Sequence, residues 1–251
     1  MNRVAASIQV LGLLLAMVAS GWAAEANPQQ AKAIAEIGRF GGKITADGMS
    51  LDTAAFGVDL RDTKVNDAGL EHIQGLTNLK DLNLTRTNVS DAGLEHLKGL
   101  TKLQYLNLTR TKVTDAGLEH LKGLTKLQSF LLTGTEVTDA GLKHLKGMTK
   151  LQGLDLGGTK VTDVGLEDLE GLTNLLGLDV ASTKVTDAGL KHVKGMTKLK
   201  LLVLGRTAVT DAGLKHLGLT KLQYLDLSET KVSDKGVEKL QKALPKCEIK
   251  R

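Results

Sequence analysis

The chain has 251 residues, of which 41% are hydrophobic and only 2% aromatic, with a formal net charge of +5 and a pI near 9.1. Its core must therefore be aliphatic, and its length allows one large domain or two small ones. The single cysteine, Cys247, excludes an intramolecular disulfide. Both prolines lie near the chain ends, so no proline-rich linker divides the middle.

The first 26 residues differ from the rest. Arg3 gives a short positive segment, and Val10–Ala19 is an apolar run too short to span a membrane. Ala24-Glu25-Ala26 fits a signal-peptidase cleavage pattern, with cleavage after Ala23 as the alternative. We expect residues 1–26 to be a signal peptide. The mature protein would be exported to the periplasm, the cell surface or the medium, without a membrane span.

Residues 27–55 are expected to form an N-terminal cap. Ala31–Phe40 has the apolar spacing of a helix, and Lys43–Thr45, after two glycines, suits a short strand. At the other end, residues 234–251 are expected to form a C-terminal cap. There Val237, Leu240 and Leu244 indicate a longer helix that Pro245 ends, and Ile249 lies where a strand leucine would be.

Residues 56–233 repeat a unit of 24 residues, L-x-x-L-x-L-x-x-T-x-V-[TSN]-D-x-G-L-x-x-[LIV]-x-G-[LM]-T-x. The first leucines of successive units are Leu79, Leu103, Leu127, Leu151, Leu175, Leu199 and Leu222. The last interval is 23 residues, because KHLGLT lacks one residue that KHLKGLT contains.

Each unit changes its hydrophobic period once. The alternating L-x-L predicts a short strand. The following aspartate, or the residue before it, can cap a helix of about two turns whose inward face holds Leu94 and Leu97 in one unit. One unit cannot bury its apolar face alone, whereas stacked units can, with their strands parallel along one side.

This motif resembles the leucine-rich repeat family. It is most similar to the ribonuclease-inhibitor-like and F-box-associated subtypes and to repeats of exported bacterial proteins. The resemblance covers about Phe56 to Ile249. It implies an α/β solenoid, a curved horseshoe with a parallel β-sheet on its concave face and short helices on its convex face. It also implies protein binding.

Where the family often has Asn or Cys, this chain has threonine, and we expect these hydroxyls to bond backbone groups at the turn after each strand. They are Thr63, Thr87, Thr111, Thr135, Thr159, Thr183, Thr207 and Thr230. Cys247 is expected to be a small residue of the C-terminal cap, not a nucleophile.

All six histidines share one repeat position: His72, His96, His120, His144, His192 and His216. A helical wheel predicts that they are exposed, and a straight column offers a metal only two ligands at a time, so we expect no metal site and no cofactor. Motifs of hydrolases, P-loop proteins and zinc proteases are not found in the sequence, and we expect no enzyme activity.

Nucleic-acid binding is not expected, despite the basic pI. The outward strand positions hold more acidic residues than arginines, and the lysines lie on the two rims without aromatic partners for stacking. The leading hypothesis is a monomeric, non-enzymatic module that binds a protein through its concave face. The alternative is an envelope scaffold whose lysines contact anionic glycans. A third role, by resemblance only, is that of F-box-type ubiquitin-ligase adaptors, but residues 27–55 are too short for an F-box.

The concave face is expected to have a shallow middle. Outward positions there are small and include Gly153, Gly157 and Gly177, whereas bulky residues occupy the flanking repeats. Tyrosine and arginine often anchor interfaces. The predicted partner-binding residues are Tyr105, Arg110, Asp155, Asp179, Arg206 and Tyr224.

Overall fold

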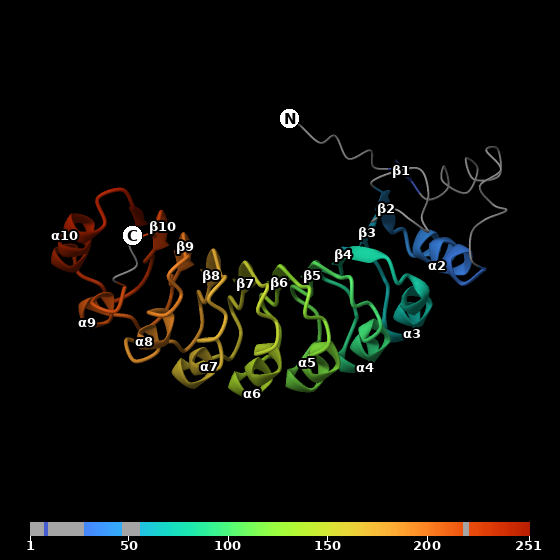
Figure 1. Cartoon of the computed structure of the whole chain (residues 1–251), viewed down its shortest axis with the longest axis horizontal. Coiled ribbons are helices and arrows are strands. Elements are labelled where there is room, and N and C mark those ends of the chain that lie inside the picture. Colours follow the sequence, from blue (N-terminus) through green and yellow to red (C-terminus); the bar gives the residue numbers. More distant parts are fainter. Residues whose placement is uncertain (1–7, 10–27, 47–55, 218–220) are drawn as a thin grey trace.

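The computed structural model describes residues 8–9, 28–46, 56–217 and 221–251. The predicted signal peptide therefore lies outside the described residues, except for a two-residue strand. The described chain forms a curved solenoid, with strands along its inner edge and short helices along its outer edge (Figure 1). The predicted α/β repeat solenoid with a concave parallel sheet is confirmed.

One continuous sheet runs along the solenoid, and its strands follow in chain order. Strands β1 to β3 pair antiparallel, and every later pair is parallel. The strands are β1 Ile8–Gln9, β2 Lys43–Ala46, β3 Phe56–Asp59, β4 Leu79–Asn83, β5 Tyr105–Asn107, β6 Ser129–Leu131, β7 Gly153–Asp155, β8 Gly177–Asp179, β9 Leu201–Val203, β10 Tyr224–Asp226 and β11 Glu248–Lys250.

The outer edge carries one short helical segment per repeat. The α-helices are α2 Pro28–Arg39, α3 Asp67–Leu70, α4 Asp91–Leu94, α5 Asp115–Leu121, α6 Asp139–Leu142, α7 Asp163–Glu167, α8 Leu190–Val193, α9 Asp211–Leu214 and α10 Asp234–Ala243. Three of them continue as 3₁₀ helices, η2 Glu71–Gly75, η3 Glu95–Leu97 and η4 Lys143–Leu145. The expected two turns are therefore often one α-helical and one tighter turn.

The core is a stack of aliphatic layers between strands and helices. Repeat leucines and valines such as Leu106, Leu118 and Val113 have no exposed surface. Burying one such side chain stabilises the fold by about 1.5–3 kcal/mol. Because each layer rests on its neighbours, the repeats stabilise one another instead of folding singly.

The threonines form the expected ladder. Each hydroxyl donates to the carbonyl oxygen three residues earlier, as Thr135 does to Leu132 at 2.7 Å. The same bond recurs from Thr63 to Thr230 at 2.6–2.7 Å. It adds a second hydrogen bond to a turn carbonyl that in most repeats already accepts from the backbone N–H of the same threonine, as Leu132 does from Thr135 at 3.1 Å, and it gives the buried hydroxyl a partner.

A second ladder, formed by the aspartates, joins consecutive repeats. The Asp115 carboxylate accepts hydrogen bonds from the backbone N–H (2.8 Å) and the hydroxyl (2.6 Å) of Thr138 in the next repeat. Equivalent pairs run from Asp67 to Asp211. The helix is capped by the residue before the aspartate. In α6 this residue is Thr138, whose hydroxyl oxygen accepts from the N–H of Ala140 at 3.2 Å.

The aspartate ladder explains the glycine two positions after each aspartate. A Cβ atom on Gly93 would lie 2.5 Å from Asp67 Oδ1 and 3.2 Å from Asp67 Cα. Real Cβ atoms do not approach other atoms so closely, so a side chain there would push consecutive repeats apart. The D-x-G pair therefore sets the distance between repeats, and with it the spacing of the strands on the inner face.

Both ends agree with the elements expected of caps. Helix α2 and strand β2 lie at Pro28–Arg39 and Lys43–Ala46. At the other end β11 pairs with β10 so that Leu225 faces Ile249, as the spacing predicts. Cys247 is buried, and burial raises the pKa of its thiol. The boundaries of the caps and the repeat region remain predictions.

Candidate functional site

The inner face presents three columns of outward side chains, because the strands pair in register. The first column runs along the middle of the sheet through Tyr105, Ser129, Gly153, Gly177, Leu201 and Tyr224. Neighbouring strands lie about 4.8 Å apart, so the two tyrosines stand about 24 Å from each other. Between them, β7 and β8 contribute no side chain to this column.

The second column brings Asp155 and Asp179 side by side. They are paired positions of the neighbouring strands β7 and β8, with Leu131 and Val203 on either side. Asp155 Oδ1 accepts from the N–H of Gly157 at 2.9 Å, and Asp179 Oδ1 accepts from the N–H of Ala181 at 2.8 Å. These bonds fix both carboxylates on the face.

The surroundings of Asp179 disfavour its ionised form. The pKa of Asp179 is raised to about 6, mainly by burial and also by the negative charges of Asp155 and Asp226, against the lowering effect of the Ala181 N–H. Neither Asp155 nor Asp179 forms an ion pair within the described residues. Asp226 in the same column differs, because Lys250 Nζ lies 2.9 Å from its Oδ2.

The third column consists of the residues that follow each second-column residue by two positions in the chain, and it begins with Arg61. In it, Gly157 lies on the face beside the two carboxylates but is not the open position that was expected. The residue is buried, and a Cβ there would lie 3.2 Å from Asp155 Oδ1 and 3.4 Å from Asp179 Oδ1. By contrast, a Cβ on Gly153 or Gly177 would make only ordinary contacts, at 3.5 Å to Ser129 Oγ and 3.9 Å to Leu201 Cδ2. The shallow middle of the concave face, called the floor below, is therefore made by Gly153 and Gly177.

The turn after each strand adds a row of residues with left-handed backbone. Six are not glycine: Asp62, Arg86, Arg110, Ser182, Arg206 and Glu229 have φ of 54–59°. Gly134 and Gly158 occupy the same row at φ of 67° and 66°. These two glycines relieve backbone strain that other residues bear, so they are not evidence for an emptied binding surface.

The two predicted arginines differ in their partners. Both Nε and Nη2 of Arg206 donate to Glu229 Oε1, at 2.9 and 2.8 Å. Arg110 is exposed, and no ion pair to it is found within the described residues.

The two predicted tyrosines are partly covered. Tyr105 is half-buried, and its hydroxyl accepts from Asn107 Nδ2 at 3.1 Å. Tyr224 is half-buried on β10.

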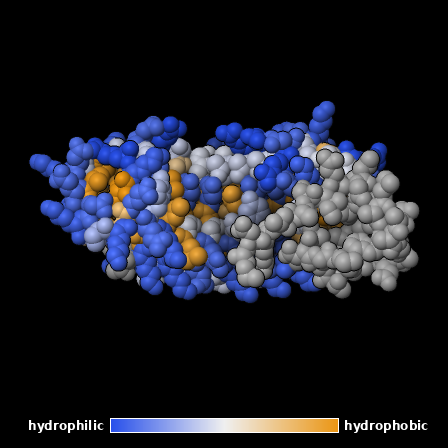
Figure 2. Space-filling view, turned by 90° about the horizontal axis from the view of Figure 1, so that it is seen from above, coloured by the Kyte–Doolittle hydropathy of each residue, from blue (hydrophilic) through white to orange (hydrophobic). Residues whose placement is uncertain are grey.

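The face is polar with local apolar areas. Figure 2 looks down on the strand side and shows hydrophobic surface on the C-terminal half, among blue polar residues. Leu201, in the first column beside Gly177, is 40% exposed. A partner on this face would meet carboxylates at the centre and an aliphatic side chain next to them.

Known proteins share this repeat. A family model for leucine rich repeats matches residues 77–137, and a second leucine-rich-repeat model matches 147–169 and 218–240. Among solved structures, internalin C2 of Listeria monocytogenes str. 4b F2365 is 28% identical, with a TM-score of 0.64 over 79% of this chain and 82% of that one.

The chain is a leucine-rich repeat protein. A second internalin of the same strain, inlF, is 21% identical, with a TM-score of 0.43 over 72% of this chain and 69% of that one. A search of the curated proteins gave no match. Proteins of this family are generally non-enzymatic and generally serve in protein interaction, and a protein-interaction repeat is the coarse description that the matches support for this chain.

The histidine column differs from the wheel prediction. Most of these rings are half-buried, and His192 is 8% exposed, with its Nδ1 2.5 Å from Glu170 Oε1 of the preceding repeat. The physical reason is lateral packing: in this leucine-rich repeat solenoid the flank of each helix rests on the next helix. In the part of the chain that the structure describes, no three His, Cys, Asp or Glu side chains converge on a common metal position.

The described helices also include none long and apolar enough to cross a bilayer.

Proposed function

We propose that this leucine-rich repeat protein binds a protein partner through its concave face, with a basic protrusion of the partner lying over Asp155 and Asp179. The observation that carries the proposal is the pair of carboxylates, without an ion-pair partner among the described residues, beside Gly153 and Gly177, which contribute no side chain to the first column. The flanking anchors are Tyr105 and Arg110 on one side and Arg206 and Tyr224 on the other.

The electrostatics favour a basic occupant. Asp179 has a raised pKa because burial and two like charges disfavour its ionised form. A lysine or arginine from a partner would reverse this penalty by placing an opposite charge beside both carboxylates. The free Arg110 at the edge of the face suits an acidic residue of the same partner, so the pattern of charges would orient it.

Filling the floor tests the proposal. In a Gly153→Arg/Gly177→Arg variant, both side chains start from open outward positions, so the protein should fold and lose its partner. The matched control is Gly123→Arg/Gly147→Arg on the outer edge, where a Cβ meets nothing within 4 Å. After a crosslinking pull-down from the native envelope identifies the partner, its affinity for both variants is measured. Equal affinity for the two variants would reject the concave face.

The second part of the proposal is that the protein is exported. It rests on three features of residues 1–26: the short positive segment with Arg3, the apolar run and the A-x-A cleavage pattern. The exported protein should lack about 26 residues by intact mass. An unprocessed amino terminus in a soluble fraction would contradict export. We propose that the mature protein acts as a monomer, which sedimentation at micromolar concentration checks.

One observation favours the glycan alternative. A polar hollow of about 330 Å³ on the rim before the strands is lined by Lys150 and Lys198 with Gln128, Gln152 and Asn174. Lysine and amide side chains are suited to sulfated or carboxylated sugars. An array of anionic glycans tests this role: binding that is lost in Lys150→Glu but kept in the floor variant would assign the function to the rim.

A further inference from the structure

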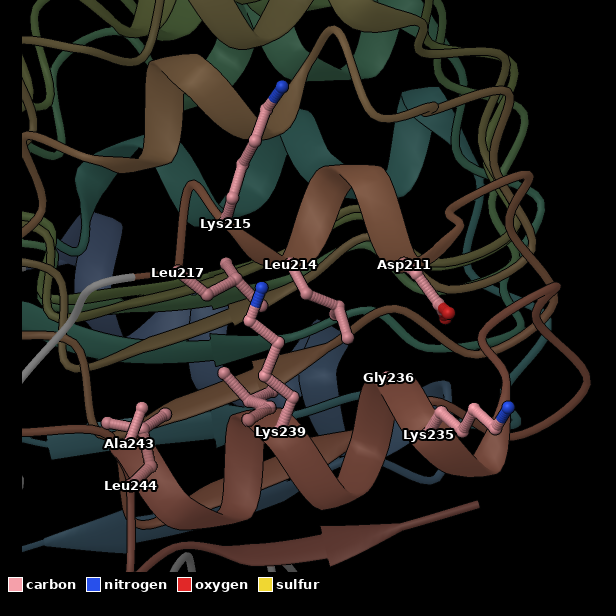
Figure 3. Close-up of a pocket in the computed structure, with 10 residues that line it drawn as sticks. Asp211, Leu214, Lys215, Leu217, Lys235, Gly236, Lys239, Ala243 and Leu244 are labelled. Carbon is pink, nitrogen blue, oxygen red and sulfur yellow. The ribbon is translucent and has the colours of Figure 1, made fainter.

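A cavity of about 480 Å³ lies between α9 and α10, at the C-terminal end of the solenoid (Figure 3). Its apolar wall comes from both helices and includes Leu214, Leu217, Leu240 and Leu244. Small-molecule sites have volumes of about 300–1,000 Å³ and are mostly apolar with a few polar groups. The size and the lining of this cavity match such a site.

The cavity follows from a local change in the repeat. The last repeat interval is one residue short, and α9 ends at Leu214, whereas α10 continues for ten residues to Ala243. The second half of α10 therefore has no helix of equal length beside it. Leu214, Leu240 and Leu244 are 6–8% exposed, whereas Leu142 at the position of Leu214 has no exposed surface.

The rim of the cavity is positively charged. Lys215, Lys235 and Lys239 line it, and within the described residues none of them forms an ion pair. The single acidic residue of the lining, Asp211, is already engaged with the N–H (2.7 Å) and hydroxyl (2.5 Å) of Ser233. Because these hydrogen bonds lower the pKa of Asp211, its carboxylate stays ionised, and the lining carries three positive charges and one negative charge, a net positive rim that suits an anion.

The lysines are not equivalent in their placement. In Figure 3 the Lys239 side chain rises from α10 toward Leu217 and Leu214, whereas Lys215 extends away from α10 and Lys235 stands at the Asp211 end. Lys239 thus places an ammonium group beside the aliphatic wall. This is the arrangement that an anionic head with an attached hydrocarbon chain requires.

We propose that the cavity binds an anionic amphiphile of the fatty-acid class, with the aliphatic chain between Leu214, Leu240 and Leu244 and the carboxylate on Lys239. An anion is favoured over a neutral apolar ligand because its charge complements the three exposed lysines of the rim, whereas a neutral ligand would gain nothing from them. This site lies on the outer side of the C-terminal repeat and is independent of the concave face.

The test uses the mature chain and dodecanoate below its micellar concentration, with dodecyltrimethylammonium as the cationic probe of similar chain length. Isothermal titration should show one dodecanoate per chain and at least ten-fold weaker binding of the cation. Lys239→Gln should weaken dodecanoate binding about ten-fold, as expected from loss of one charge-assisted contact. Ala243→Trp, which adds an indole to the lining, should abolish it.

The control is Lys191→Gln, because Lys191 holds the position of Lys215 in the preceding repeat, away from the cavity. Its affinity for dodecanoate should equal that of the wild type. The proposal is overturned if the wild type does not bind dodecanoate, if the cation binds equally well, or if Lys239→Gln binds as tightly as Lys191→Gln. Since Lys239 is exposed, Lys239→Gln should fold even if Ala243→Trp does not.

Discussion

Substitution of Gly141 by alanine tests the aspartate ladder. Gly141 lies in α6, and a Cβ there would press on Asp115 Oδ1 and lie 3.2 Å from Asp115 Cα and 3.1 Å from Leu118 Cδ1. The carboxylate cannot turn aside freely, because both its oxygens are held by Thr138. The new methyl group must therefore either break these hydrogen bonds or shift the repeat backbone.

The expected magnitude is the sum of opposing effects. Alanine in a helix is better than glycine by about 1 kcal/mol. Overpacking costs about 1–3 kcal/mol, and losing two charge-assisted hydrogen bonds costs about 1.5 kcal/mol each at the low end of the usual range. We expect Gly141→Ala to lower the free energy of unfolding by about 3–5 kcal/mol.

Urea unfolding followed by circular dichroism measures the change. Gly147→Ala in the same repeat is the matched control, because a Cβ at Gly147 meets nothing within 4 Å, and its effect should stay within about 0.5 kcal/mol. If Gly141→Ala is neutral or stabilising, as helix propensity alone predicts, the ladder does not set the spacing of the repeats.

Three further outcomes are expected. Burial raises the pKa of Asp179 to about 6 from 3.8, so its protonated form favours folding below about pH 4 and this contribution is lost as the pH rises through about 6. Unfolding free energy of the wild type should therefore fall relative to Asp179→Asn between about pH 4 and 7, and parallel pH curves would contradict this. Thr135→Val, which removes the buried hydroxyl bound to Leu132, should cost about 1 kcal/mol in the same urea assay; no change would mean that the ladder is not stabilising. Zinc should leave the thermal midpoint unchanged, and a shift that disappears in His120→Ala would instead reveal a metal site.

The repeat unit predicted most of the fold, because local period and stacking are both encoded in it. The alternating leucines gave the strands, and the distance between Leu225 and Ile249 gave the register of the last one. The threonine hydroxyls could also be placed, since their bonds reach only three residues back. Each of these features depends on contacts within one repeat or on its exact period.

Features that join different repeats were harder to predict. The bond from Asp115 to Thr138 spans 23 residues, and only the constant pairing of aspartate with glycine in D-x-G hinted at it. The left-handed backbone of the turn could not be predicted, because glycine, the residue that indicates it, stands only at Gly134 and Gly158, whereas other positions of the row hold residues such as arginine. The partial burial of the histidines was not predicted, because a helical wheel describes a single helix and omits the neighbouring helix that covers its flank.

The candidate site was predicted in part. The structure places Tyr105, Asp155, Asp179 and Tyr224 on the strand face, makes Asp155 and Asp179 direct neighbours, and puts Arg110 and Arg206 in the turns that follow β5 and β9. The sequence did not show that Gly157 is buried, that Arg206 is engaged with Glu229, or that Arg110 is free of ion pairs. Whether these residues bind a partner remains a proposal.

Site-specific photo-crosslinking in the native envelope shows directly whether the partner lies on the concave face. A benzophenone side chain is introduced at Ser129, on the strand face next to the floor, or at Gly123, in open space on the outer edge. We expect one discrete protein adduct from position 129 and none from position 123. An adduct from position 123 with none from position 129 would contradict concave-face binding.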